Sequence, residues 1–84
     1  MSQMTLGFKY NGTLMNILCK GNDTLNSVFD RYCTKSEKPK NDLAFYINGQ
    51  RIIGDNRTII EHGFQNLAVF DVVYTKHIYG AKNN

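Results

Sequence analysis

Two cysteines and two histidines are the residues of this 84-residue chain best suited to catalysis or metal binding. Cys19 and Cys33 form no Cys-x-x-Cys pair, and His62 and His77 stand alone, so no set of metal ligands occurs at a usual spacing. Each cysteine falls on the apolar side of a periodic segment, where a free thiol acts as a small hydrophobic residue. The sequence therefore predicts two buried thiols, no metal site and no cofactor.

A catalytic serine or cysteine would need a base beside it. No nucleophile motif surrounds Ser36, and nothing in the sequence brings this serine to a histidine. A Cys33 thiolate activated by His62 is the other arrangement, but a buried helix cysteine is the favoured interpretation. We therefore expect a non-enzymatic protein. A small enzyme or a redox sensor built on Cys19 and Cys33 stays open as an alternative.

Length and charge limit the function further. The chain is long enough for one domain, and no apolar run approaches the ~20 residues that a membrane-spanning helix needs. The N-terminus also lacks the apolar core of a signal peptide, so we expect an intracellular protein of the cytoplasm or nucleus. The net charge of +3 is modest, which disfavours nucleic acid as a partner but is compatible with acidic peptides as partners. We expect a monomer.

Alternating apolar residues predict a β-hairpin in the first twenty residues. Leu6, Phe8 and Tyr10 share one face of a first strand, and Asn11-Gly12 supplies a tight turn. The returning strand covers residues 13–20 and carries apolar residues on both faces. Its two sets are Met15, Ile17 and Cys19 on one face, and Leu14 and Leu18 on the other. The second set predicts either that another element covers this second face or that its apolar surface is exposed.

A single amphipathic helix is predicted to follow the hairpin. Asp23 or Thr24 can cap its first turn, and the helix should end before Pro39, because the residue before a proline disfavours the helical conformation. Apolar residues recur at helical spacing through the segment. They are Leu25, Val28, Phe29, Tyr32 and Cys33.

The second half of the chain predicts three short strands and one helical turn. Residues 43–47 and 50–53 form two strands around an Asn-Gly turn, and residues 68–74 form the last strand, with Phe70 and Val72 facing inward. Thr58 and Glu61 have the spacing of a capping box for the helical turn, and Gly63 suits its C-terminal end. We place one domain at residues 4–75, a disordered N-terminus at 1–3 and a flexible tail at 76–84.

This order of elements predicts an α+β protein with the β-grasp of ubiquitin. A mixed sheet of four to five strands would carry the main helix diagonally across one face, with a short second helical turn. Short motifs in the same order make the chain resemble ubiquitin-like proteins over residues 4–74, and among them the small ubiquitin-related modifier (SUMO) branch. These motifs are Tyr32-Cys33, Gly49-Gln50-Arg51-Ile52, Asp55-Asn56, Thr58, Glu61-His62-Gly63 and Phe70-Asp71-Val72.

The resemblance departs from SUMO at both ends of the chain. Modifiers of this kind end in Gly-Gly, whereas this chain has His77-Ile78-Tyr79 and then Gly80. The long acidic N-terminal extension of SUMO is also missing. A conjugatable modifier, trimmed to a terminal Gly80 by removal of residues 81–84, is therefore an alternative rather than the first prediction.

The resemblance implies one partner-binding surface, a groove between the second strand and the helix. An extended apolar peptide with acidic flanks would add there as a further strand. The residues that would line it are Met15, Ile17, Leu18, Cys19, Lys20, Val28, Arg31 and Lys35. Met15, Ile17, Cys19 and Val28 could equally be core residues, whereas Leu18 should be exposed on the strand edge.

A second surface lies on the sheet face, where ubiquitin carries its main recognition patch. The residues that would form it here are Tyr10, Tyr46 and Val73. The first prediction is thus a SUMO-like protein-interaction domain that binds partner peptides in the groove. Conjugation through Gly80, ubiquitin-type recognition through the sheet face, and a scaffold role without peptide binding are the alternatives.

Overall fold

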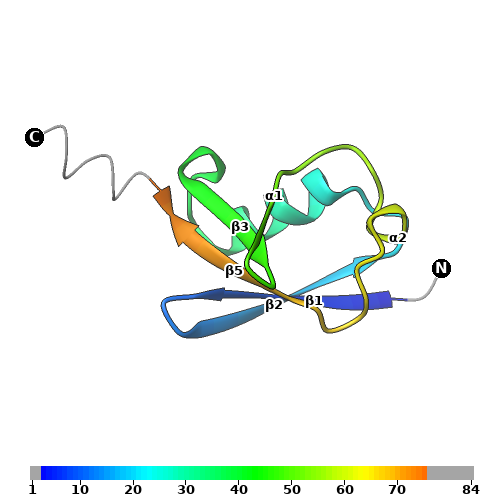
Figure 1. The fold of residues 1–84 in the computed structure, drawn as a ribbon, viewed down its shortest axis with the longest axis horizontal. Helices are drawn as coiled ribbons and strands as arrows, with labels where there is room; N and C mark the ends of the chain where they lie inside the picture. The colour runs from blue at the N-terminus through cyan, green and yellow to red at the C-terminus, as the bar shows by residue number, and fades with distance from the viewer. Residues whose placement is uncertain (1–2, 76–84) are drawn as a thin grey trace, which may run out of the picture.

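The protein is described here by a computed structural model covering residues 3–75. Eight elements follow one another along the chain (Figure 1). They are β1 (Gln3–Tyr10), β2 (Thr13–Lys20), α1 (Leu25–Ser36), the short 3-10 helix η1 (Lys40–Asp42), β3 (Leu43–Ile47), β4 (Gln50–Ile52), α2 (Ile59–His62) and β5 (Val69–Tyr74).

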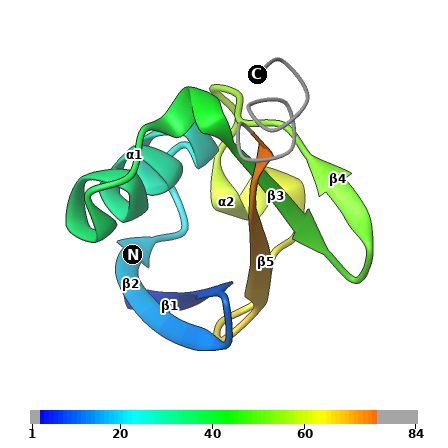
Figure 2. The ribbon, with the colours of Figure 1, turned by 90° about the vertical axis from the view of Figure 1, so that its left-hand side faces the viewer.

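All five strands form one mixed sheet with the order β2-β1-β5-β3-β4. The first and last strands, β1 and β5, pair in parallel at its centre, and the other neighbours are antiparallel. The sheet curves around its contents, and α1 lies on its inner side (Figure 2). The predicted β-grasp architecture is therefore confirmed.

Both tight turns have the geometry that the Asn-Gly pairs predict. Asn11 and Gly12 have φ values of 50° and 81°, and Asn48 and Gly49 have φ values of 51° and 80°. A type I′ turn requires positive φ at both central residues, and asparagine and glycine adopt it most readily. These two turns set the register of the β1–β2 and β3–β4 hairpins.

The helix α1 is amphipathic as predicted, and its five apolar residues are all buried. Thr24 is the N-cap, accepting a hydrogen bond from the Ser27 N–H at 3.2 Å, while Asp23 instead accepts from the backbone of Lys20. The helix ends at Ser36, where Glu37 takes a left-handed conformation with φ 58°. The helix therefore stops before Pro39, as expected.

The core is an aromatic cluster between α1 and the sheet. Phe8 is fully buried, and its ring lies 4.6 Å from Tyr32, 5.2 Å from Phe70, 5.9 Å from Phe45 and 6.0 Å from Phe29, measured between centroids. Such stacked and edge-to-face pairs add to the burial of apolar surface. Two aromatic residues of α1 and one each of β3 and β5 thus surround Phe8 of β1.

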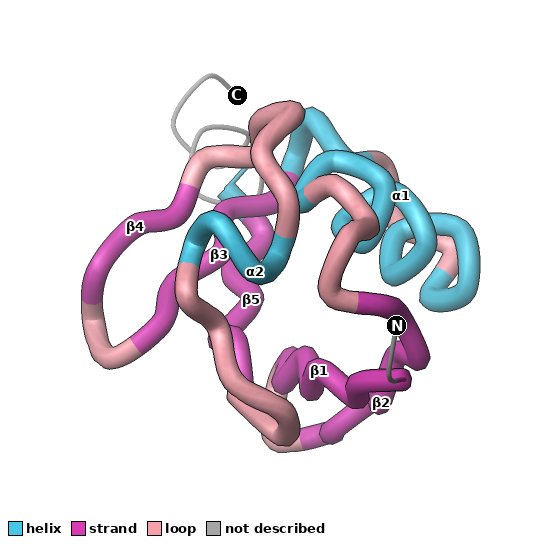
Figure 3. Tube along the Cα trace, turned by 90° about the vertical axis from the view of Figure 1, so that its right-hand side faces the viewer, coloured by secondary structure: helices cyan, strands magenta, loops and turns pink. Residues whose placement is uncertain are grey.

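The short helix α2 lies at the end of the molecule where α1 begins, beside the loop that joins β2 to α1 (Figures 1 and 3). The loop before it bonds to the start of α1, since the N–H groups of Leu25 and Asn26 donate to the carbonyls of Arg57 and Asp55 at 2.9 Å. Ile59 anchors α2 in the core. Small differences from expectation occur elsewhere: β1 begins at Gln3, one residue before the predicted domain boundary, and η1 was not predicted. In addition, β4 ends one residue earlier and β5 begins one residue later than predicted.

The capping box of α2 leads to a pH-dependent prediction. The Thr58 N–H donates to Glu61 Oε1 at 2.8 Å, and this bond is the largest cause that lowers the pKa of Glu61. Folded protein therefore binds fewer protons at Glu61 than unfolded protein, so the stabilisation exists above the ordinary pKa and is lost as pH falls through the lowered pKa. In Glu61→Gln this contribution should be absent.

Urea denaturation of both proteins from neutral pH down to about pH 2 measures the effect. The wild type should be more stable than Glu61→Gln at neutral pH, and the difference should shrink in acid. A difference that stays constant with pH would contradict the assignment.

Candidate functional site

The outer edge of β2 carries backbone groups that point away from the sheet. Tyr10 and Thr13 flank the two-residue turn, so their pair is hydrogen-bonded and the pairs then alternate along the hairpin. Thr13, Met15, Ile17 and Cys19 consequently bond to β1. The N–H and C=O groups of Leu14, Asn16, Leu18 and Lys20 face outward, on the edge beside α1.

Two side chains occupy this edge at its Lys20 end. Arg31 reaches from α1, and its Nη1 donates to the Leu18 carbonyl at 2.6 Å. Asp23 Oδ2 accepts from the Lys20 N–H at 2.8 Å and lies 3.6 Å from Arg31 Nη1. The backbone groups of Leu18 and Lys20 are therefore partly taken within the protein itself.

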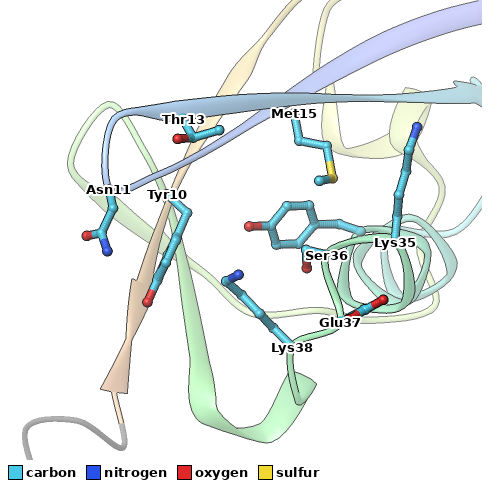
Figure 4. Close-up of a pocket in the computed structure, with 9 residues that line it drawn as sticks. Tyr10, Asn11, Thr13, Met15, Lys35, Ser36, Glu37 and Lys38 are labelled. Carbon is cyan, nitrogen blue, oxygen red and sulfur yellow. The ribbon is translucent and has the colours of Figure 1, made fainter.

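A hollow of about 400 Å³ lies between β2 and α1 near the β1–β2 turn (Figure 4). Tyr10, Met15 and Tyr32 are among its lining residues, and Lys35 and Lys38 come from α1 and the segment that follows it. Lys38 Nζ lies 4.5 Å from the centroid of the Tyr10 ring, in a cation–π contact. This hollow is apolar inside and cationic at its rim.

A second hollow of about 300 Å³ lies at the other end of the same seam. Its walls include Leu18, Lys20, Asp23 and Arg31. The hydrogen bonds of Arg31 and Asp23 cross this end, so both of these charged side chains are already engaged. The two ends of the seam thus differ in chemistry: one is mainly apolar, and the other is more polar and carries internal hydrogen bonds.

The predicted groove residues separate into lining and core residues. Met15 and Lys35 line the hollow near the turn, and Leu18, Cys19, Lys20 and Arg31 line the second one. Leu18 is 57% exposed, as the sequence predicts. Val28 and Ile17 are only 0% and 1% exposed, so the alternative that they are core residues holds for both. Both residues therefore lie beneath the groove rather than on its surface.

The predicted sheet-face patch does not form as a unit. Tyr46 and Val73 lie diagonally on the outer face, since Tyr46 pairs with Asp71 and Val73 with Ala44. Tyr10 lies on the opposite face and lines the hollow beside α1. Including Tyr10 in the patch was wrong, because Tyr10 shares the period-two face of Leu6 and Phe8, which point inward.

Charged neighbours surround Tyr46 on the outer face. Asp71 is its partner on β5 and Arg51 its partner on β4, with the Arg51 guanidinium carbon 5.9 Å from the Tyr46 ring centroid. The centre of this face is therefore more polar than an aliphatic recognition patch. Gly80, the predicted conjugation terminus, lies outside the described residues.

Neither cysteine has the surroundings of a nucleophile. Cys19 and Cys33 are buried free thiols, and burial is the main cause that raises the pKa of both. A thiol with a raised pKa stays protonated and is a poor nucleophile. His62 pairs with Asp55, with 2.8 Å between Nε2 and Oδ1, and stacks on Phe64. No cluster of three metal-ligating side chains occurs in residues 3–75.

Of the residues that line the hollow near the turn, the predicted groove contained only Met15 and Lys35. Tyr10 was assigned to the sheet-face patch instead, Tyr32 was treated only as a core residue of the helix, and Lys38 was not singled out. The signal for Tyr10 was its period with Phe8, and the signal for Lys38 was its position directly after the end of α1. None of the helices described is long and apolar enough to cross a membrane.

Comparison with known proteins identifies the fold. No protein-family model and no curated protein matches the sequence. Among solved structures, the ubiquitin-like domain of an Arabidopsis thaliana protein, determined by NMR, has a TM-score of 0.78 at 16% identity, covering 89% of this chain and 80% of that one. A second structure from the same plant protein, combining evolutionary couplings with sparse NMR data, has a TM-score of 0.76 at 17% identity, covering 86% of each chain.

A ubiquitin is similar to the same extent. The ubiquitin of Caldiarchaeum subterraneum has a TM-score of 0.75 at 16% identity, covering 87% of this chain and 94% of that one. At such low identity the likeness concerns the fold alone. The strand order, the helix across the inner side of the sheet and these neighbours together show that this chain has the ubiquitin-like β-grasp fold.

Proposed function

We propose that this protein is a non-enzymatic protein-interaction domain that binds an extended segment of a partner along the seam between β2 and α1, in a SUMO-like manner. The observation that carries the proposal is the open edge of β2 beside an apolar hollow with a cationic rim. An added strand would take its affinity from backbone hydrogen bonds and its specificity from the hollow.

Three properties of the seam support this function. Leu14 and Leu18 are exposed apolar residues on an edge strand, which proteins otherwise tend to protect. Met15 offers an adaptable thioether surface inside the hollow. Lys35 and Lys38 form no ion pair with any carboxylate in residues 3–75, so they are free to attract an acidic flank.

An NMR titration tests the proposal directly. The probe is a peptide with a short valine- and isoleucine-rich core and an acidic flank, added to the isotope-labelled full chain. Amide signals of Leu14, Asn16 and Met15 should shift, together with those of Lys35. Reversing two rim charges in Lys35→Glu/Lys38→Glu should weaken binding about tenfold, since each exposed pair contributes up to about 1 kcal/mol.

A matched variant and a matched peptide serve as controls. Tyr46→Ala lies on the outer face and should leave affinity unchanged, and a peptide with a lysine flank should bind more weakly than the acidic one. Shifts confined to Tyr46 and Val73, or no response to the acidic peptide, would refute binding at the seam.

A further inference from the structure

We infer, on the basis of the proposed function, that a partner strand pairs only with the half of β2 nearest the turn and stops where Arg31 and Asp23 occupy the edge. The partner is then a short extended segment of another protein. It carries apolar residues on both of its faces and its acidic residues at the end beside Lys35 and Lys38.

The length limit follows from the hydrogen-bonding groups of the edge. A strand added to β2 needs the outward N–H and C=O groups of alternate residues. Those of Leu14 and Asn16 have no partner among the described residues, and neither has the N–H of Leu18. The Leu18 carbonyl accepts from Arg31 at 2.6 Å, and the Lys20 N–H donates to Asp23 at 2.8 Å. An added strand therefore finds no vacant group beyond Leu18.

The two-faced character follows from the pleat of β2. Partner residues opposite Met15 and Ile17 would point toward α1, where Met15 lines the hollow of about 400 Å³. Partner residues opposite Leu14 and Leu18 would point to the outer face, where these leucines are 52% and 57% exposed. Apolar cross-strand neighbours stabilise such pairs. A segment with apolar residues at consecutive positions, rather than at alternate ones, fits both faces.

The orientation of the acidic residues follows from the charges at the two ends of the seam. Near the turn, Lys35 and Lys38 lie at the rim with one acidic neighbour, Glu37. At the other end, Arg31 is already engaged by the Asp23 carboxylate at 3.6 Å and by the Leu18 carbonyl, which leaves Lys20 as the one further cation among the residues lining that end. Acidic residues of a partner consequently gain more beside Lys35 and Lys38 than beside Arg31.

A peptide series measured on the full chain tests this inference. The short peptide has five apolar residues and an acidic flank at one end or the other, and the long peptide has two further apolar residues at the end without the flank. With wild type, amide hydrogen exchange should slow at Leu14, Asn16 and Leu18 and stay unchanged at Lys20. The long peptide should bind no tighter than the short one.

Arg31→Met supplies the contrast, because methionine keeps an apolar stem and donates no hydrogen bond to Leu18. The Leu18 carbonyl is then free to accept a hydrogen bond from the long peptide. The long peptide should therefore bind this variant about two- to tenfold more tightly than the short one, which is the usual contribution of one hydrogen bond. Lys35→Met removes a charge from the same seam without freeing the edge, so it should show no such gain. Arg31 is partly exposed, and the dispersion of amide signals checks that each variant is folded.

The outcomes separate the two hypotheses. Binding at the seam with slowed exchange at Lys20, or with a gain from the long peptide in wild type, overturns the length limit and leaves the proposed function intact. Equal affinities for the two short peptides, which carry the acidic flank at opposite ends, overturn the inference that acidic residues lie beside Lys35 and Lys38. Absence of any response in residues 13–20 refutes the proposed function, and the length limit with it.

Discussion

Replacement of Phe8 by alanine is expected to lower the free energy of unfolding by about 3–5 kcal/mol, the usual cost of removing a buried phenylalanine side chain. Phe8 is fully buried and contacts Tyr32, Phe45 and Phe70, which come from α1, β3 and β5. Since a domain of this size is stable by only about 5–15 kcal/mol, the loss would be a large share of the total. Urea denaturation followed by circular dichroism measures it.

Two further variants show whether the effect belongs to the aromatic cluster. Phe8→Leu keeps most of the apolar volume and should cost clearly less than Phe8→Ala. Leu14→Ala removes a side chain that is 52% exposed and should change stability little. A loss from Phe8→Ala no larger than that from Leu14→Ala would show that Phe8 is not central to the core.

Replacement of Gly54 by alanine is expected to lower the free energy of unfolding by about 1–3 kcal/mol, because the added methyl group overpacks the start of α1. A Cβ atom at Gly54 would clash with Asn26 Oδ1 and lie 3.3 Å from Phe29 Cδ2. Asn26 cannot simply turn aside, since its amide accepts from Lys40 and donates to Asn56, both at 3.2 Å. Thermal and urea denaturation of the variant measure this cost.

A double-mutant cycle with Asn26→Ala separates overpacking from other effects of alanine. Without the Asn26 amide, the substitution at Gly54 should cost at least about 1 kcal/mol less than in wild type, which is a coupling typical of residues in contact. Additive effects of the two substitutions would mean that the methyl group is accommodated in some other way.

Local structure followed from residue types because each signal acts over a few positions. The stripe from Leu25 to Cys33 indicated which face of α1 is buried, and the Asn-Gly pairs indicated both tight turns. Such local signals do not predict the strand order, because the parallel pairing of β1 with β5 joins residues about sixty positions apart. No short-range pattern distinguishes that pairing from others. The sequence did not predict η1 for a related reason, since a single 3-10 turn has no periodicity of its own.

The site was predictable in outline and not in detail. Exposure of Leu18 followed from its place on the second face of β2. The bond from Arg31 to the Leu18 carbonyl depends instead on the distance between α1 and β2, which only the packed structure determines. The burial of Val28 was left open because the floor of a groove and the core behind it use the same residue types. Tyr10 shows that strand alternation must be followed to the last residue of a strand.

The central position of β5 has a consequence for synthesis of the chain. Because β5 lies between β1 and β3, these two strands have no shared neighbour until residues 69–74 have been made. During synthesis the N-terminal hairpin and α1 therefore precede the strand that completes the sheet, so the core between α1 and the full sheet can close only after β5 has been made.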